Sequence, residues 1–251
     1  MLILVGLGLF DEKDLTLRGL EEAKVADKIY LDKYTGFWNG DLKILQKMIG
    51  KNVEEVNRKD LEDNSKKIVD EAKKKNVVIF VQGDPLVATT HTSLILEARK
   101  SNVKTKIIHN SSIISAIAET GLHIYKFGAT VTIPFLEKTQ GKLPESVYET
   151  IKMNKIRGLH TLCLLDVTIG QELKCMTVNE AMEILMEIEE KKKEKVFTGD
   201  TEIVVFEKIG SGSVPKYGKV KNSMKKSFEI PAILIIPAKL HFTEKEYLDS
   251  I

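Results

Sequence analysis

Short apolar runs that end in turn-forming residues set the strongest limit on how this chain can fold. The first strands are expected at residues 2–5, 28–32, 77–81 and 105–109. Helix-like segments separate them, at residues 14–26, 60–75 and 91–101. A strand without a polar face is typical of a parallel sheet that helices cover on both sides, because a solvent-exposed face would need alternating polar residues. The pattern therefore predicts one α/β domain over residues 1–110.

The second half predicts another α/β domain, over residues 111–251, joined to the first through the stretch HNSSIISA. Four more strands are expected at residues 129–135, 161–166, 202–209 and 232–236.

A helix is expected directly after Thr177. Thr177 and Glu180 have the spacing of a capping box, in which each side chain binds a backbone N–H of the first turn. The residues that follow at helical spacing form one apolar face: Ala181, Ile184, Leu185 and Ile188. Thr243 and Glu246 repeat the capping-box spacing and predict a last helix.

Charge and composition narrow the class of protein. Thirty-eight basic residues against 36 acidic ones leave a formal charge of +2, so we expect no nucleic acid as a partner. The opening MLILVGLGLF is too short to span a bilayer and lacks the basic start of a signal peptide, so no membrane association is expected. Cys163 and Cys175 fit no Cys-x-x-Cys pattern, and we expect reduced thiols in a cytoplasmic protein.

Two glycines directly after the first strand resemble the start of a dinucleotide fingerprint. Gly6 and Gly8 have the right spacing, but Asp11 stands where the third glycine belongs. Three acids, Asp11, Glu12 and Asp14, would repel a pyrophosphate at the start of the next helix. Two interpretations stay open: a tight turn with acidic capping, or a pocket edge for a ligand without phosphates, such as a cation.

Polar residues also follow two other strands. Gly83-Asp84-Pro85 comes after residues 77–81, and Ser111-Ser112 follows His109. In open α/β sheets, ligands bind outside the carboxyl ends of the strands. Surface turns and helix N-caps use the same residue types. Each motif can therefore be interpreted either as part of a ligand site or as an ordinary turn or cap.

No metal site is expected. The five histidines, at positions 91, 109, 123, 160 and 241, have no His-Glu-x-x-His neighbourhood and form no cluster with carboxylates in the sequence. His91 is expected to cap or orient its helix. The sequence also lacks a Gly-x-Ser-x-Gly nucleophile elbow.

Longer stretches together resemble one family. LVGLGLFDEKDLTLRGLE, QGDPLVATTHTSLILEA, IHNSSIISAIAETGLHIYKFG and GLHTLCLLDV are similar to the diphthine synthases, methyltransferases of the tetrapyrrole-methylase fold. MTVNEAMEIL, VFTGDTEIVVFEKIGSGS and ILIIPAKLH extend the resemblance over nearly the whole chain.

The resemblance implies two α/β domains of the tetrapyrrole-methylase type, with the active site in the cleft between them, and a homodimer. It implies S-adenosylmethionine as the methyl donor, with S-adenosylhomocysteine as its product. The implied substrate is translation elongation factor 2, on a histidine that carries an aminocarboxypropyl group. Repeated methylation of its amino group gives diphthine, in diphthamide biosynthesis. Three methyl groups are the archaeal-type endpoint and four the eukaryotic-type one; the compact length favours the archaeal type.

The resemblance also implies which residues bind the cofactor. They are Leu9, Asp84, Val87, Ser112, Ile113, Leu165, Ile209 and Ala232. Ala232 stands where family members often have histidine, and PFLEKTQGKLPES lacks the tryptophan expected in that loop. No catalytic base is identified; Asp11 is a candidate, but a helix cap is the favoured role.

Two alternatives to diphthine synthesis stay open. The same fold serves precorrin and uroporphyrinogen methyltransferases, which would act on a tetrapyrrole. A non-catalytic, cofactor-sensing partner of translation factors is the other. The loop at residues 34–40, with Trp38, is either a lid, a dimer contact or an ordinary surface loop with one packed aromatic residue.

Overall fold

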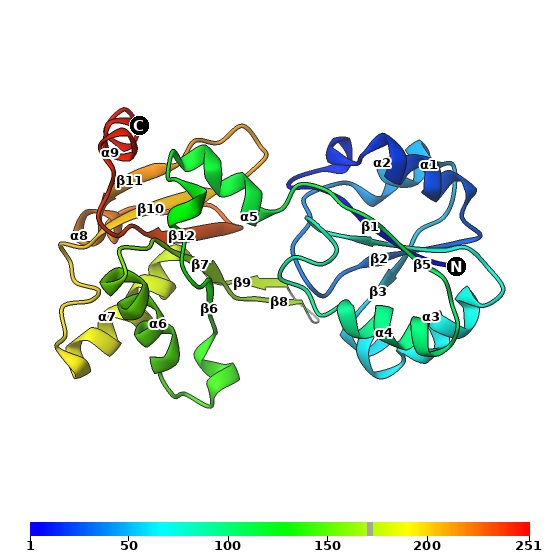
Figure 1. The fold of residues 1–251 in the computed structure, drawn as a ribbon, viewed down its shortest axis with the longest axis horizontal. Coiled ribbons are helices and arrows are strands. Elements are labelled where there is room, and N and C mark those ends of the chain that lie inside the picture. Colours follow the sequence, from blue (N-terminus) through cyan, green and yellow to red (C-terminus); the bar gives the residue numbers. More distant parts are fainter. Residues whose placement is uncertain (170–172) are drawn as a thin grey trace. The chain divides into compact units, whose positions relative to one another are not determined.

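The computed structural model describes residues 1–169 and 173–251 of the chain, drawn in Figure 1. The chain divides into two compact units, Met1–Ala116 and Ile117–Ile251. The boundary expected from the sequence lies after residue 110, whereas helix α5 (Ile113–Ala116) groups with the first unit. Within the described ranges, no helix combines the length and apolar character needed to cross a bilayer.

The first unit is built on a five-stranded parallel sheet with the order β3-β2-β4-β1-β5. The strands are β1 (Leu2–Gly6), β2 (Lys28–Asp32), β3 (Glu54–Val56), β4 (Val77–Val81) and β5 (Thr105–Ile108). The helices between them are α1 (Leu17–Val25), α2 (Leu42–Ile49), α3 (Ser65–Ala72) and α4 (Thr92–Lys100). The parallel sheet predicted from the apolar runs is confirmed.

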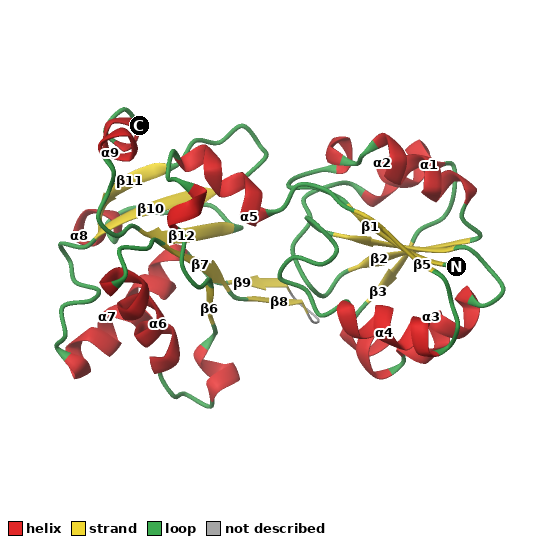
Figure 2. Ribbon diagram, in the orientation of Figure 1, coloured by secondary structure: helices red, strands yellow, loops and turns green. Residues whose placement is uncertain are grey.

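Helices cover both faces of this sheet, as Figure 2 shows. Alternate residues of β1 belong to different cores: Leu2 and Leu4 pack with α3 and α4, whereas Ile3 and Val5 pack with α1 and α2. Every residue of β1 and β4 is buried. Burial on both sides explains why these strands carry no polar face. Polar side chains next to β1 and β4 can therefore stand only in the turns at the ends of these strands.

Local capping accounts for the differences from the expected helices. The segment after Asp11 is a short 3₁₀ turn (Glu12–Asp14), and α1 begins only after Thr16, whose hydroxyl accepts from the Gly19 N–H at 3.1 Å. Helix α2 was not predicted, although Asp41 caps it by accepting from the backbone N–H groups of Lys43 and Ile44. The helix expected from residue 60 is a π-helical turn (Lys59–Asp63) followed by α3.

The second unit has a mixed five-stranded sheet with the order β11-β10-β12-β7-β6, in which only the β6–β7 pairing is parallel. Its strands are β6 (Val131–Ile133), β7 (Thr161–Leu165), β10 (Glu202–Glu207), β11 (Lys216–Lys219) and β12 (Ala232–Ile236). A separate ribbon pairs β8 (Val167–Ile169) with β9 (Leu173–Cys175). The helices are α6 (Glu145–Ile156), α7 (Val178–Lys192), α8 (Val220–Ser223) and α9 (Phe242–Leu248). The four predicted strands are confirmed, whereas β8, β9 and β11 were not predicted.

Helices α6 and α7 pack on one face of this sheet and build a large apolar core with it. The predicted capping box of α7 is present, since Thr177 accepts from the Glu180 N–H at 3.2 Å and Glu180 accepts from the Thr177 N–H at 2.7 Å. The predicted apolar face is buried, and both free cysteines lie inside the unit.

The predicted cap of α9 is wrong. His241, not Thr243, is the N-cap, and Glu244 reaches back to the His241 N–H at 2.7 Å. The glutamate of this capping box is therefore Glu244, whose side chain is buried in the unit. Glu246, the residue expected in that position, is exposed.

Glu244 is the centre of a buried polar network. Its side chain is fully buried and accepts from His160 Nε2 at 3.0 Å, from the His123 N–H at 2.8 Å and from the ammonium group of Lys126. Burial by itself would raise the pKa of Glu244, but the donors around it lower that pKa to about 2. The carboxylate thereby joins α9 to the rest of the second unit.

Replacing Glu244 by glutamine removes a charge that several donors surround. We expect Glu244→Gln to lower the free energy of unfolding at pH 7 by about 3 kcal/mol. Because the folded pKa is below the ordinary value, the carboxylate stabilises the fold fully above pH 4.5, and this contribution is lost as the pH falls towards 2. Urea denaturation between pH 3 and 7 should therefore show the difference between the two proteins shrinking at low pH.

Glu246→Gln on the same helix is the matched control, because Glu246 is exposed. It should unfold like the unchanged protein at every pH. Equal stability of the two variants would show that the buried network does not hold α9.

Candidate active site

Three turns meet at the carboxyl ends of β1, β4 and β5. The Leu7 N–H donates to the Val81 carbonyl at 2.8 Å, and Gly8 and Gly83 exchange two backbone hydrogen bonds, at 3.2 and 2.8 Å. The turn after β5 joins them through Asn110, whose Nδ2 donates to the Gly6 carbonyl at 2.9 Å. The glycine motif, the Gly-Asp-Pro motif and the His-Asn-Ser-Ser motif therefore form one continuous cluster of backbone, here called the turn junction.

The glycines are required because the turns approach so closely. A Cβ atom on Gly6 would lie 2.5 Å from the Gly83 carbonyl oxygen and 2.7 Å from Asn110 Cβ. Gly8 has a φ of +83°, and a Cβ there would lie 2.5 Å from Asp14 Cβ. This packing explains the Gly-x-Gly spacing without a bound phosphate.

The acids of the first turn serve as caps. Asp11 accepts from the Lys13 N–H at 2.9 Å, and Asp14 accepts from the Phe10 N–H at 2.7 Å. Glu12 is buried and accepts from the Asp41 N–H at 3.1 Å. Acidic capping of a tight turn is therefore present, and Asp11 has its favoured role, whereas the interpretation of the turn as a pocket edge stays a prediction.

Asp84 connects two of the turns. Its carboxylate is buried, with Oδ1 accepting from the Leu86 N–H at 3.0 Å and Oδ2 from the Asn110 N–H at 3.2 Å. Oδ2 also lies 2.8 Å from Nδ1 of His109, whose side chain is 68% exposed. Sequence reasoning selected Asp84 but missed His109 and Asn110, because both looked like ordinary residues at the end of a strand.

The other four residues expected in this unit lie on the same turns. Leu9 follows Gly8, and Val87 donates its N–H to the Asp84 carbonyl at 3.2 Å. A Cβ on Gly83 would lie 3.8 Å from Ser112 Cα, so the turn that leads to Ile113 is also adjacent. Leu9, Val87 and Ile113 are only partly buried and present apolar surface. The Ser112 hydroxyl accepts from the Ile114 N–H at 3.2 Å, which is the capping role anticipated for it.

The three residues expected in the second unit lie at the same end of neighbouring strands in its sheet. Leu165 ends β7, directly after Leu164, which pairs with Ile233. Ala232 begins β12 opposite the last residue of β10, and Ile209 follows two residues later. Ile209 and Leu165 are buried, whereas Ala232 is partly exposed. They come together at this end because β12 runs antiparallel to both β7 and β10, so the start of β12 lies beside the ends of the other two strands.

Of the two roles expected for His91, capping its helix or orienting it, the described residues show the second. It precedes α4 but makes no capping hydrogen bond; its Nε2 lies 3.0 Å from Asp32 Oδ2, and both side chains are buried. His91 therefore ties the start of α4 to the end of β2. Trp38, in the next loop, is 7% exposed and packs in the core with α1 and α2, as the packed-aromatic interpretation requires.

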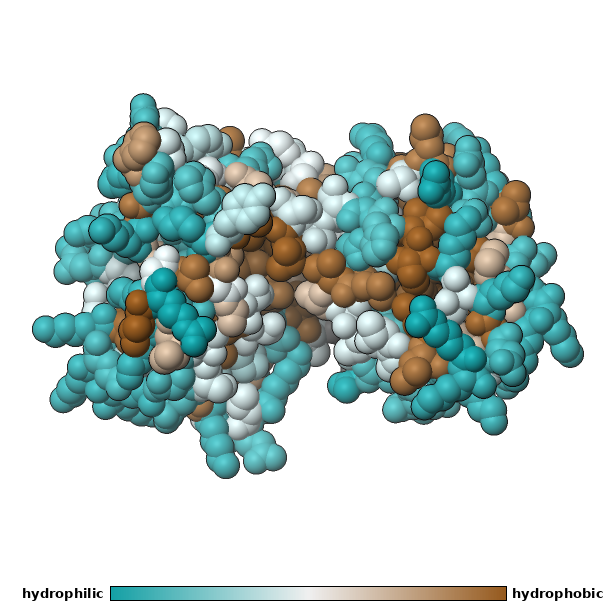
Figure 3. All heavy atoms as spheres, viewed as in Figure 1, coloured by the Kyte–Doolittle hydropathy of each residue, from teal (hydrophilic) through white to brown (hydrophobic). Residues whose placement is uncertain are grey.

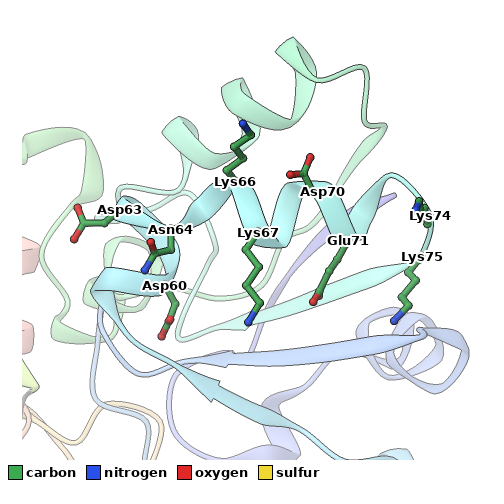
Figure 4. Close-up of a pocket in the computed structure, with 9 residues that line it drawn as sticks. All are labelled: Asp60, Asp63, Asn64, Lys66, Lys67, Asp70, Glu71, Lys74 and Lys75. Atoms are coloured by element: carbon green, nitrogen blue, oxygen red, sulfur yellow. The ribbon is translucent and has the colours of Figure 1, made fainter.

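A separate depression lies beside α3, as Figure 4 shows. It measures about 900 Å³ and is lined by four acids, four lysines and one asparagine, from Asp60 to Lys75. The charges of opposite sign are interspersed, so the depression offers no preference for an anion or a cation. Among the residues that the structure describes, no group of histidine, cysteine and acidic side chains could hold a metal ion.

Comparison with known proteins adds independent evidence. The family model for tetrapyrrole (corrin/porphyrin) methylases matches residues 1–212. The diphthine synthase of Methanocaldococcus jannaschii is 46% identical over 253 residues, covering 99% of this chain and 97% of the relative, and that of Methanococcus vannielii is 43% identical with the same coverage. A crystal structure of a diphthine synthase matches with a TM-score of 0.88 at 37% identity, covering 99% of this chain and 94% of that one. The expected fold class, two α/β domains of the tetrapyrrole-methylase type, is confirmed.

The turn junction allows a test by paired substitutions. Gly8 and Gly50 both have a positive φ, of +83° and +75°, but a Cβ on Gly50 meets no atom of the described residues within 4 Å. We expect Gly50→Ala to cost about 1 kcal/mol of unfolding free energy through backbone strain alone. Gly8→Ala should cost about 2 kcal/mol more, because the new methyl group overlaps Asp14. Denaturant unfolding measures both, and equal losses would show that the turns can separate without cost.

Proposed function

This chain belongs to the tetrapyrrole (corrin/porphyrin) methylase family, in its diphthine synthase group, and on that premise we propose the following reaction. The protein transfers methyl groups from S-adenosylmethionine to the amino group of an aminocarboxypropyl-modified histidine in translation elongation factor 2. The product is diphthine, an intermediate of diphthamide biosynthesis. The observation that carries the proposal is the likeness to diphthine synthases over 99% of the chain.

The turn junction suits S-adenosylmethionine better than a nucleotide with phosphates. When bound, this cofactor supplies a methyl group on a positively charged sulfonium. Acidic caps beside the first turn would repel a pyrophosphate but are compatible with a cationic ligand. The partly buried Leu9, Val87 and Ile113 offer the apolar surface that an adenine ring needs.

Few side chains are needed for the chemistry. The protein must hold a neutral amine in line with the methyl group, about 3–3.5 Å away, and exclude water. The rigid turns of the first unit provide such a platform, because each is hydrogen-bonded to another.

We also propose that Leu165, Ile209 and Ala232 of the second unit bind the cofactor. Two observations support this proposal: the family resemblance, and the position of the three residues at the same end of neighbouring strands. Ala232 replaces a histidine common in the family, so its contact with the cofactor would be made by the backbone and the methyl group alone.

A homodimer in the cytoplasm completes the proposal. Large apolar side chains at the surface support a protein contact: Leu17 is 80% exposed, Phe242 is 73% exposed and Tyr125 is 98% exposed. On the face drawn in Figure 3, hydrophobic residues form patches at the surface, bordered by hydrophilic ones. Elongation factor 2 is the proposed protein substrate; no nucleic acid is needed as a partner.

The reaction can be tested by mass spectrometry. Elongation factor 2 bearing the aminocarboxypropyl-histidine is incubated with this protein and S-adenosylmethionine. We expect a gain of three methyl groups, the archaeal-type endpoint, whereas a gain of four would indicate that the carboxylate is also esterified. No gain with cofactor binding intact would contradict the proposal, and turnover of a precorrin or uroporphyrinogen would then favour the tetrapyrrole alternative. Binding without transfer to either acceptor would favour a cofactor sensor.

Asp84→Ala tests the cofactor site separately. The change removes the acceptor that holds the turns after β4 and β5 together, so we expect S-adenosylmethionine to bind at least several-fold more weakly in calorimetry. The control is Asp70→Ala on α3, where the carboxylate is exposed and pairs only with Lys73 among the described residues. Unchanged affinity in Asp84→Ala would remove this carboxylate from the site.

A further inference from the structure

We propose that His109, oriented by Asp84, is the general base that takes a proton from the substrate amine before each methyl transfer. The inference rests on the proposed function and deepens it, because it assigns a proton acceptor to the reaction. The observation behind it is the position of His109 in the turn junction: one side of its ring contacts the buried Asp84, and the other side is exposed to solvent.

The two ring nitrogens of His109 have different surroundings. Nδ1 lies 2.8 Å from Oδ2 of Asp84, whose side chain is 7% exposed. A carboxylate only accepts hydrogen bonds, so this contact places the ring proton on Nδ1. Nε2 then carries the lone pair, and the 68% exposure of the side chain leaves it accessible.

The carboxylate that orients the ring is itself held by more than one contact. Oδ2 of Asp84 also accepts from the Asn110 N–H at 3.2 Å, and Oδ1 accepts from the Leu86 N–H at 3.0 Å. Asp84 is thus held in place by the backbone on both sides. A buried acid that orients a histidine in this way also stabilises the imidazolium formed when Nε2 takes a proton.

The charges around His109 favour such a role. Within the described residues, Asp84 is the only charged group in hydrogen-bonding or ion-pair contact with the imidazole. The neighbouring turn contributes Asp11 and Asp14, whose carboxylates are occupied by backbone N–H groups. No lysine or arginine of the described ranges pairs with Asp84, so its charge remains available to the ring.

The reaction requires a proton acceptor at every step. An alkyl amine is largely protonated near neutral pH and cannot attack in that form. Nε2 of His109 accepts one proton from the ammonium group, and the freed lone pair forms the new N–C bond. The C–S bond breaks with its electron pair passing to sulfur, so the sulfonium becomes a neutral thioether. The product nitrogen is again a cation, and His109 returns its proton to solvent before the next transfer.

A purely structural role would be to hold Asp84 through Nδ1, and two substitutions distinguish it from catalysis. The amide nitrogen of asparagine can occupy the place of Nδ1, so His109→Asn keeps a donor to Asp84 but has no Nε2. His109→Ala loses both nitrogens and leaves room for added imidazole. His241→Asn is the matched control, since His241 is an exposed N-cap and asparagine is a good N-cap residue.

The rates are measured on modified elongation factor 2 at saturating S-adenosylmethionine, from pH 5.5 to 9. We expect kcat of His109→Asn to fall about 100-fold at pH 7, with cofactor affinity unchanged, and to depend less on pH than in the unchanged protein. Imidazole should restore part of the activity of His109→Ala, and His241→Asn should match the unchanged protein. A normal rate and pH profile in His109→Asn would overturn the proposal.

A second measurement does not depend on the methyl acceptor. Nitrogen-15 NMR of the unchanged protein should show that the neutral ring of His109 carries its proton on Nδ1 and none on Nε2. A proton on Nε2 would overturn the proposal even if methylation is normal. Absence of methylation by the unchanged protein would count against the proposed function, while the NMR result would still decide the orientation of His109.

Discussion

The mutual hydrogen bonding of three turns is the interaction on which the rest of the first unit depends. Gly8 and Gly83 exchange backbone hydrogen bonds across the ends of β1 and β4, and Asn110 and Asp84 attach the turn after β5. The strands β1 and β4 behind these turns are apolar and buried along their whole length, so polar groups next to them gather at their ends. The hydrogen-bonded turns therefore lie above buried apolar strands, and the proposed cofactor site is formed by these turns.

The same junction separates this fold from nucleotide-binding relatives of similar appearance. In a dinucleotide fold, the glycines after the first strand make room for a pyrophosphate at a helix N-terminus. Here the space beside Gly6 and Gly8 is filled by the protein's own Gly83, Asn110 and Asp14, and the N–H groups of the first turn are bound to carboxylates. The chain therefore keeps the local glycine pattern but fills with its own residues the space that a pyrophosphate would need. Its membership in a methylase family agrees with that difference.

Much of the fold follows from the sequence, because burial on both sides of a strand leaves a continuous apolar run. The strands β2, β4 and β12 begin and end at the predicted residues. Short or polar elements were missed: β11 reads KYGK, and its position depends on pairing with β10 rather than on an apolar pattern. The capping error at α9 has a similar cause, since Glu244 and Glu246 look alike until tertiary contacts bury one of them. In the site, sequence patterns located Asp84 but not its partner His109, because a contact between residues 25 positions apart leaves no local signal.

The place of β1 in its sheet also bears on how the chain reaches this structure. Leu2 pairs with Val77 on one side and with Thr105 on the other, so the first strand lies inside the sheet although its neighbours come much later in the sequence. Loop closure over such distances is slow compared with the formation of local helices. During synthesis, a strand with two apolar faces must therefore wait unpaired until β4 and β5 have emerged, and in that interval it is exposed to aggregation. We infer that assembly of the first unit is limited by the capture of β1, and that the turn junction forms only once this strand is in place.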